Sequence, residues 1–294
     1  MKQKIGWIGT GVMGKSMCSH IIKAGYEVSV YNRTKRKAEG LIEMGAIWRL
    51  NPKEVAENSN IIFTIVGYPK DVEEVYFGEM GIISSTKPNS IIVDMTTSEP
   101  TLAKKIYEQA KIRNVYSIDA PVSGGDIGAR EGSLAIMAGG DKNTYEKVLP
   151  FFKLMGKNIA YMGNAGAGQH TKMSNQILIA TTMIGVVESL LYAYKAGNDL
   201  NEVIDVIGKG AAGCWSINNL GPRVVKKIFD PGFFIKHFVK DMGIALQEAK
   251  NMNLALPGLA LAYQFYLSAI AMGLENLGTQ GLYKVFAKMN GIEI

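Results

Sequence analysis

Short β-branched runs alternate with segments of helical pattern over the first half of the chain. The strand-like runs are KIGWIG, EVSVYN, NIIFTIV, SIIVDM, NVYSIDA and LAIMAGG, and helical stretches such as VMGKSMCSHIIKAG separate them. Successive parallel strands need long crossover connections, which are usually helices, so the alternation predicts a mostly parallel sheet with helices on both faces. We expect this doubly wound α/β domain to occupy residues 1–163.

A different pattern follows Gly163. Apolar residues recur at helical spacing in residues 168–197, 200–208, 235–252 and 256–273, while the β-branched runs fade. The glycine-rich stretch GNAGAGQ, residues 163–169, therefore marks the predicted boundary. Residues 164–294 are predicted to form an all-helical domain.

Composition and charge argue against several classes of protein. With 47% hydrophobic and 20% charged residues, the chain has the composition of a globular protein rather than a disordered one. The net charge of +6 comes from basic residues scattered among acidic ones, which indicates a solvated surface and no nucleic-acid partner. Residues 177–194 are apolar, but Glu188 interrupts them and the flanking basic residues show no sidedness. We expect a buried helix there and no membrane span.

The two cysteines, Cys18 and Cys214, lie far apart, with neither metal-ligand spacing nor a disulfide pattern. This usage is typical of a reducing cytoplasm. The first residues, MKQKIGWIGTGVMG, reach glycines before any apolar stretch of signal-peptide length, so no secretion signal is predicted. We therefore expect a cytoplasmic protein without a bound metal.

The stretch GTGVMG, residues 9–14, places three glycines between the first strand-like run and the first helical one. This is the G-x-G-x-x-G pattern of dinucleotide-binding Rossmann domains, in the context that it requires. Gly9 permits a tight turn, Gly11 lets the backbone approach a pyrophosphate, and Gly14 allows close helix packing. Glycines also end strands for structural reasons alone, but position and flanks favour a coenzyme here. The predicted coenzyme-binding turn comprises Gly9, Thr10, Gly11, Val12, Met13 and Gly14.

The second strand-like run, EVSVYN, ends where an acidic residue would bind the adenosine ribose of NAD. This chain has Asn32 there, followed by Arg33 and Thr34. Without the carboxylate nothing repels a 2′-phosphate, and a guanidinium and a hydroxyl can bind one through charge-assisted hydrogen bonds. The alternative is a solvated basic turn. The sequence favours NADP(H) over NAD, with Asn32, Arg33 and Thr34 as contacts.

Further strand ends should lie at the same edge, because ligands bind outside the carboxyl ends of parallel strands. The runs NIIFTIVGYP and SIIVDMTTSEP place Val66, Gly67, Thr96 and Thr97 there. We expect Val66, Gly67 and Thr97 to contact the coenzyme. Ser98 precedes a helical stretch and is expected to cap it.

The segment DAPVSGG, residues 119–125, follows another strand-like run. Ser123, Gly124 and Gly125 offer three successive backbone N–H groups without bulky side chains, and such an array can hold a carboxylate. A glycine-rich turn without a chemical role is the alternative. Its place at the carboxyl end of a strand favours a substrate-binding function.

The stretch GQHTKMSNQ, residues 168–176, stands at the head of a long apolar run. On a helix, Lys172, Asn175 and Gln176 share one face. Lysines usually point into solvent, but the glycine-rich junction, the apolar continuation and the amide on the same face favour catalysis. The ammonium can hand a proton to a carbonyl oxygen as hydride arrives at carbon, with Asn175 orienting the substrate. We assign no catalytic role to the histidines His20, His170 and His237.

Four stretches together resemble the β-hydroxyacid dehydrogenase family: GTGVMG (9–14), DAPVSGG (119–125), GQHTKMSNQ (168–176) and FVKDMGIALQEA (238–249). They stand in the family's order and spacing, and the resemblance covers essentially the whole chain. The family includes 3-hydroxyisobutyrate dehydrogenase, tartronate semialdehyde reductase and glyoxylate/succinic semialdehyde reductase. The resemblance implies a Rossmann domain followed by an all-helical domain, joined by a long helix, with the active site between them.

The resemblance also implies roles for single residues. Lys172 matches the catalytic lysine, Ser123, Gly124 and Gly125 the substrate-binding turn, and Asn175 the substrate-binding amide. Thr97 and Lys240 match coenzyme contacts, and Phe233 and Asp241 match residues that line the active site. Asn32 to Thr34 are similar to the NADPH-using glyoxylate and succinic semialdehyde reductases. Gln176 departs from the pattern, since many relatives carry a second asparagine, so its contact stays open.

Our first hypothesis is an NADP(H)-dependent oxidoreductase that interconverts a small carboxylate-bearing aldehyde or keto acid, such as glyoxylate or succinic semialdehyde, with its hydroxy acid. A 3-hydroxyisobutyrate or tartronate semialdehyde-type dehydrogenase is the alternative, and a non-catalytic NADP-binding scaffold is the alternative of another class. Lys172 argues against that scaffold and against an imine reductase, and the short helical half argues against 6-phosphogluconate dehydrogenase. The apolar helical half predicts a homodimer or homotetramer.

Overall fold

The computed structural model describes residues 3–293, and the chain divides into two compact units between Lys172 and Met173. The first unit contains one sheet with the strand order β3-β2-β1-β4-β5-β6-β8-β7, in which β9 also pairs with β8. Strands β1 to β6 pair in parallel, whereas β8 runs antiparallel to β6 and β7. The predicted mostly parallel, doubly wound sheet is therefore confirmed. The strands are β1 (Ile5–Ile8), β2 (Val28–Tyr31), β3 (Ile47–Trp48), β4 (Ile61–Thr64), β5 (Ile91–Asp94), β6 (Tyr116–Asp119), β7 (Val122–Ser123), β8 (Leu134–Gly140) and β9 (Gly156–Gly163).

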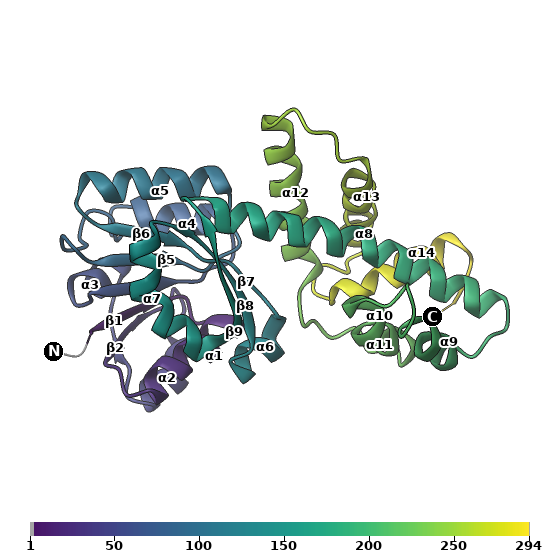
Figure 1. The fold of residues 1–294 in the computed structure, drawn as a ribbon. Coiled ribbons are helices and arrows are strands. Elements are labelled where there is room, and N and C mark those ends of the chain that lie inside the picture. Colours follow the sequence, from purple (N-terminus) through teal and green to yellow (C-terminus); the bar gives the residue numbers. More distant parts are fainter. Residues whose placement is uncertain (1–2, 294) are drawn as a thin grey trace. The chain divides into compact units, whose positions relative to one another are not determined.

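Helices cover both faces of this sheet (Figure 1). One face carries α1 (Val12–Lys23), the 3-10 helix η1 (Lys35–Ala38), α2 (Glu39–Glu43), α6 (Gly125–Glu131) and α7 (Lys142–Met155). The other face carries α3 (Pro52–Glu57), α4 (Pro69–Phe77) and α5 (Pro100–Ile112). Both faces must therefore be apolar, which explains why the central strands read as continuous hydrophobic runs.

Alternate residues of the central strands feed two separate cores. Trp7 and Phe63 point to the core beneath α1 and α7, with ring centroids 5.5 Å apart, whereas Ile8 and Ile62 point to the core beneath α3 to α5. This period of two is the geometry of a pleated strand. It holds the carboxyl ends of β1, β4, β5 and β6 in register at one edge of the sheet.

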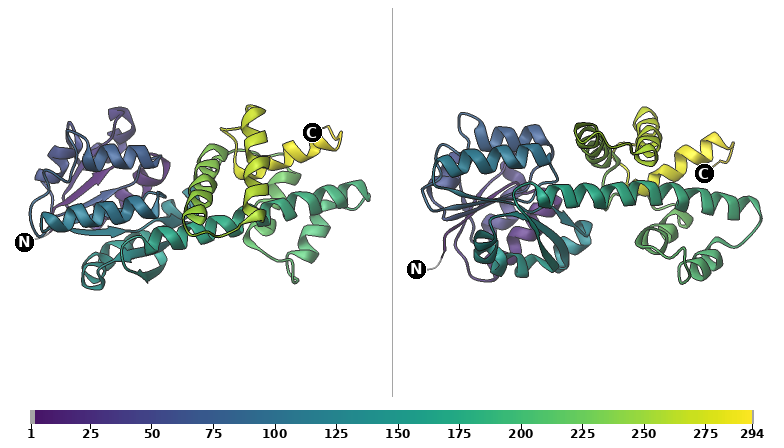
Figure 2. Two further views of the ribbon diagram at one scale, coloured as in Figure 1. Left: turned by 90° about the horizontal axis from the view of Figure 1, so that it is seen from above. Right: turned by 45° about the horizontal axis from the view of Figure 1, so that its top comes forward.

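The second unit is helical. It includes most of α8 (Ala167–Lys195), which begins in the first unit, and then α9 (Leu200–Ile207), α10 (Trp215–Asn219), α11 (Gly221–Val225), α12 (Ile235–Asn251), α13 (Pro257–Ala271), the 3-10 helix η2 (Thr279–Gly281) and α14 (Leu282–Met289). Helices α12 and α13 pack side by side (Figures 1 and 2). The rings of Phe238 and Tyr266 pack edge to face, with their centroids 5.0 Å apart. The predicted all-helical second half with a long first helix is confirmed.

Helix α8 is long and apolar enough to cross a membrane by length and composition, a property that core helices of soluble proteins share. The structure buries 39% of its most apolar stretch. Leu178, Tyr192 and Tyr194 are exposed by 68%, 79% and 51%. The expectation of a buried helix is therefore only partly met, and an apolar surface remains uncovered on this chain.

The two cysteines occupy different environments. Cys18 lies in the core beneath α1, with 0% of its surface exposed, and burial raises the pKa of its thiol. Cys214 is only partly buried, and its Sγ accepts a hydrogen bond from the Ile217 N–H at 3.4 Å, at the start of α10. Both are free thiols.

Candidate coenzyme and catalytic site

The three positions of the turn between β1 and α1 differ in whether the fold requires glycine there. Gly9 has a φ of +97°, and a Cβ there would overlap the Ile65 carbonyl oxygen. A Cβ on Gly14 would overlap the Gly9 carbonyl oxygen, whereas a Cβ on Gly11 would meet nothing within 4 Å. The fold thus needs glycine at 9 and 14, and it leaves open space at Gly11. Open space beside a helix N-terminus is what a bound pyrophosphate requires.

Two buried hydroxyls of the first unit have no hydrogen-bond partner among the described residues, Thr10 Oγ1 and Ser98 Oγ. Buried polar groups are nearly always paired, so these orphaned hydroxyls indicate a ligand or water partner. The prediction that Ser98 caps the next helix is wrong, because Glu99 is the N-cap of α5. The residues at the carboxyl edge of the sheet therefore fit a dinucleotide coenzyme.

Side chains at the end of β2 stabilise the glycine turn. Asn32 Oδ1 accepts a hydrogen bond from the Thr10 N–H, and Asn32 Nδ2 donates to the Thr34 carbonyl, both at 3.0 Å. The Arg33 guanidinium lies 2.8 Å from Asp71 Oδ1, with the two side chains 82% and 13% exposed. An exposed ion pair contributes about 0–1 kcal/mol, so Arg33 can exchange Asp71 for a phosphate with little loss.

The ends of β4 and β5 are joined by side chains. Thr96 was placed there from the sequence, whereas Thr64 and Asp94 were not. Thr96 Oγ1 accepts from the Val66 N–H at 3.0 Å, while Thr97 is half-buried beside it. Asp94 Oδ1 accepts from Thr64 Oγ1 and from the Thr96 N–H, each at 3.0 Å. Burial raises the pKa of Asp94 to about 6, and the nearby Asp119 contributes, although these hydrogen bonds oppose the shift.

The raised pKa of Asp94 predicts a pH dependence of stability. Between about pH 4 and pH 6 the unfolded chain ionises this carboxyl while the folded protein keeps it protonated. The free energy of unfolding should therefore fall as pH rises through this window, by on the order of 3 kcal/mol. Asp94→Asn should remove that fall, as measured by urea unfolding at the two ends of the window. The exposed Asp205→Asn serves as control, and a variant that falls as much as the wild type would contradict the assignment.

The predicted substrate turn begins inside a strand. Ser123 belongs to β7 and pairs with Ala135 of β8, and Gly124 and Gly125 follow with φ of +128° and +63°. Other residues rarely adopt such backbone angles, so conformation alone accounts for both glycines. The half-buried Ser123 side chain lies directly before this turn.

Lys172 lies in the second turn of α8 and is only 6% exposed, which excludes the alternative of a solvated lysine. Asn175 and Gln176 follow one turn later on the same helix, half-buried and 2% exposed, respectively. The helix therefore presents the three side chains on one face, as their spacing predicted.

A polar cluster of the second unit gives Gln176 a defined contact. Its Nε2 donates to Asp241 Oδ2 at 2.6 Å, and its Oε1 accepts from Asn175 Nδ2 at 2.7 Å. Asp241 is 1% exposed, and Lys240 Nζ lies 3.0 Å from its Oδ1. Phe233, on the same unit, is 37% exposed and packs edge-on against Phe238. The longer side chain of Gln176 thus brings its amide to a buried carboxylate. The sequence alone had left this contact open.

The histidines and the other side chains that could bind a metal ion were also located in the structure. His20 Nε2 lies 2.9 Å from the Ala129 carbonyl oxygen, a contact within the first unit. Burial and the neighbouring Lys240 lower the pKa of His237. Within residues 3–293 no cluster of three or more His, Cys, Asp or Glu side chains could hold a metal ion.

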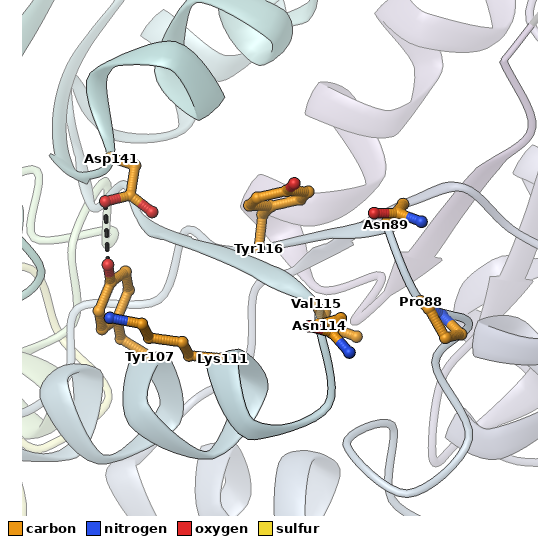
Figure 3. A pocket seen from close by; sticks show the side chains of 8 residues that line it. All are labelled: Pro88, Asn89, Tyr107, Lys111, Asn114, Val115, Tyr116 and Asp141. Carbon is orange, nitrogen blue, oxygen red and sulfur yellow. Dashed lines mark hydrogen bonds between the residues drawn. The ribbon is translucent and has the colours of Figure 1, made fainter.

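The hollow in Figure 3 lies at the other edge of the sheet. Its volume is about 290 Å³, and its lining includes Asn89 before β5 and Tyr116 at the start of β6. A hydrogen bond of 2.9 Å from the Tyr107 hydroxyl to Asp141 crosses one side of it (Figure 3). Because these are the amino ends of the strands, the hollow is separate from the glycine turn and from every predicted site residue.

Asp119 and Gln169 make hydrogen bonds at the carboxyl edge of the sheet, and we assigned them no role from the sequence. Asp119 ends β6 and accepts hydrogen bonds from the start of α8, and Gln169 binds the loop after β5. Both stand in the stretches DAPVSGG and GQHTKMSNQ that carried the resemblance. The signal in the sequence was Asp119 itself, an acidic residue at the end of a strand. A carboxylate there can bind the N-terminus of a nearby helix, which carries partial positive charge.

Two family descriptions match consecutive parts of the chain. Residues 4–163 match the NAD binding domain of 6-phosphogluconate dehydrogenase. Residues 166–286 match the NAD-binding domain of NADP-dependent 3-hydroxyisobutyrate dehydrogenase.

Named relatives match over 92% or more of this chain. A probable 3-hydroxyisobutyrate dehydrogenase-like mitochondrial protein of Arabidopsis thaliana is 54% identical, covering 99% of this chain and 87% of the relative. The 2-hydroxy-3-oxopropionate reductase of Escherichia coli is 38% identical over 97% of this chain and 98% of its own. A chloroplastic glyoxylate/succinic semialdehyde reductase of Arabidopsis thaliana is 33% identical, over 92% and 76%. The finer resemblance to glyoxylate reductases is thus weaker than that to the first relative.

A solved structure shows the same architecture. The 3-hydroxyisobutyrate dehydrogenase of Mycobacterium tuberculosis with L-serine superposes with a TM-score of 0.89 at 26% identity. The match covers 97% of this chain and 99% of the other.

Proposed function

The chain belongs to the 3-hydroxyisobutyrate dehydrogenase-like group of the β-hydroxyacid dehydrogenase family, and we propose that it reduces a small carboxylate-bearing aldehyde or keto acid with NADPH. Membership makes it an NAD(P)-dependent oxidoreductase that acts on CH–OH groups. The observation that carries the catalytic proposal is the burial of Lys172, 6% exposed, in the second turn of α8. A buried ammonium on a helix that starts at the carboxyl edge of a coenzyme-binding sheet is suited to proton transfer.

The end of β2 supports NADPH as the coenzyme. Asn32 replaces an acidic residue and is held by Thr10 and Thr34, so position 32 carries no negative charge to repel a 2′-phosphate. Arg33 is exposed and pairs with Asp71 at the surface. We propose that the guanidinium binds the 2′-phosphate, because a charge-assisted hydrogen bond to phosphate outweighs an exposed ion pair.

We assign the proton step to Lys172. When bound, the nicotinamide supplies the hydride. The Lys172 ammonium donates a proton to the substrate oxygen as negative charge develops there, and its amine takes that proton back in the oxidation direction. The Ser123 side chain and the N–H groups of Gly124 and Gly125 hold the substrate carboxylate. Asn175 and Phe233 contribute to substrate binding, with Asp241 holding Gln176 and Lys240.

The substrate is proposed as a class. Glyoxylate and succinic semialdehyde were the first candidates, and a 3-hydroxyisobutyrate or tartronate semialdehyde-type reaction was the alternative. The names of the relatives favour the alternative, because 2-hydroxy-3-oxopropionate is tartronate semialdehyde. One methylene of difference in an apolar pocket changes selectivity by about 10- to 200-fold, so several of these compounds should react to different extents.

The proposal is tested with four compounds, each with NADPH and with NADH. They are glyoxylate, succinic semialdehyde, tartronate semialdehyde and methylmalonate semialdehyde. We expect kcat/KM to favour NADPH, and Arg33→Ala to raise the KM for NADPH by about 10-fold without changing that for NADH. Arg113→Ala, which removes a guanidinium bound to the Ser84 carbonyl, is the matched control. Binding of NADPH with no turnover of any compound would favour the non-catalytic scaffold instead.

We also propose that the chain forms a homodimer or homotetramer. The exposed apolar side chains of α8, Leu178 and Tyr192 among them, support this, because monomers rarely leave large apolar patches uncovered. Light scattering at micromolar concentration should give a particle heavier than the 32.0 kDa chain. A particle of that mass alone would contradict the proposal.

A further inference from the structure

The first turn of α8 is bound by a buried carboxylate from the sheet. Asp119, the last residue of β6, is 4% exposed. Its Oδ1 accepts a hydrogen bond from the Gly166 N–H at 2.7 Å, and its Oδ2 accepts from the Gln169 N–H at 2.9 Å. The first N–H groups of a helix have no partner inside it and carry partial positive charge. Asp119 therefore caps α8 from a neighbouring element with both of its oxygens.

Gln169 makes a second attachment, to the loop after β5. This side chain is 0% exposed. Its Oε1 accepts from the Ser98 N–H at 3.0 Å, and its Nε2 donates to the Thr96 carbonyl oxygen at 2.7 Å. The two bonds bracket Thr97, a predicted coenzyme contact. Only a side chain with both a donor and an acceptor can make this pair of bonds, so the amide is chemically required.

The backbone at the start of α8 packs closely against the backbone of the sheet. A Cβ on Gly139 of β8 would lie 2.7 Å from both Asp119 Oδ1 and the Gly168 nitrogen. A Cβ on Gly168 would lie 2.7 Å from the Asp119 carbonyl oxygen. Real Cβ atoms do not approach so closely, so α8 touches the ends of β6 and β8 backbone to backbone. The start of the helix is thereby fixed on the ends of β6 and β8 and on the loop after β5.

Lys172 follows Gln169 by three residues, so the two side chains leave α8 on the same face, one turn apart. From this face Gln169 reaches the loop of Thr96 to Ser98. We propose that Asp119 and Gln169 are positioning residues of the reductase, which fix the Lys172 ammonium relative to the Thr97 loop. This inference rests on the proposed role of Lys172.

A double-mutant cycle between Gln169 and Lys172 tests it in the full-length protein. Gln169→Met keeps the size of the side chain and removes both hydrogen bonds. A misplacement of about 1 Å can lower turnover about 100-fold, so we expect kcat to fall by 10- to 100-fold. In a Lys172→Ala background the same substitution should lower the residual rate by less than about 3-fold, because the two residues act as one unit.

Each outcome decides the matter. Equal losses in both backgrounds would mean that Gln169 acts through general structure, and an unchanged kcat would mean that it positions nothing; either overturns the inference. If Lys172→Ala alone leaves turnover intact, the proposed function fails instead, and the two failures are distinguishable. Gln247→Met, at an exposed position of α12, is the matched control with unchanged kcat. Circular dichroism establishes folding.

Asp119→Asn provides a second variant should Gln169→Met fail to fold. It keeps one acceptor oxygen and places an NH₂ group against an N–H of the α8 turn, so one of the two caps is lost. The expected result is the same non-additive loss of kcat with Lys172→Ala. An additive loss here likewise overturns the inference.

Discussion

Lys172→Ala should lower kcat by about 10²–10⁴-fold, the range typical of a lost general acid–base group. The substituted enzyme has no side chain to protonate the developing alkoxide. NADPH binding should persist, because the glycine turn and the end of β2 are held by contacts of their own. Steady-state turnover of the best compound of the panel, alongside NADPH fluorescence titration, measures both quantities.

Lys172→Arg separates proton donation from charge. Arginine keeps the positive charge but does not release a proton at neutral pH, so it should restore little of the lost kcat. Lys195→Ala, at the exposed end of the same helix, is the control for a lost lysine on α8. Full turnover by the alanine variant would remove Lys172 from the mechanism.

Gly11→Val should weaken coenzyme binding strongly while leaving the fold intact. A Cβ at this position meets nothing within 4 Å, and the backbone, at φ −66° and ψ −169°, suits any residue. The added side chain would occupy the space that a pyrophosphate needs. We expect the affinity for NADPH to fall by on the order of 100-fold, about 3 kcal/mol of binding free energy. Thermal unfolding with and without NADPH reports this directly, because a ligand stabilises the state that binds it.

Gly14→Ala gives the opposite result and serves as the matched comparison. Its Cβ would overlap the Gly9 carbonyl oxygen, so the variant should unfold at a lower temperature even without coenzyme. If Gly11→Val instead lowers the unfolding temperature of the free protein, the open space at Gly11 has a structural purpose. If it binds NADPH normally, the coenzyme does not use this turn.

The fold was predictable wherever burial leaves a pattern in the sequence. The central strands β1, β4 and β5 are covered on both faces and read as continuous apolar runs, and the long helices α8, α12 and α13 extend over enough turns to show a period. Strand β9 was missed because most of its side chains are exposed or half-buried and so carry no apolar run. The two-residue strands β3 and β7 and the short helices α10 and α11 are too brief for any periodicity.

The candidate site was predictable where chemistry dictates a residue type at a local spacing. Glycines in a turn and a lysine one turn before an amide are such local patterns. The bonds from Asp119 to Gly166 and from Gln176 to Asp241 join residues far apart in the chain, which no local spacing encodes. The pairing of Arg33 with Asp71 is of the same kind, since it depends on how β2 and α4 meet.

The contrast between the two thiols has a practical use. Cys18 is sealed in the core and its thiol resists ionisation, whereas Cys214 is partly accessible at the start of α10. Alkylating reagents attack the thiolate, so a maleimide dye applied to the folded protein should attach at Cys214 and spare Cys18. The unaltered chain therefore offers a single labelling position, suitable for a fluorescent reporter on the helical unit.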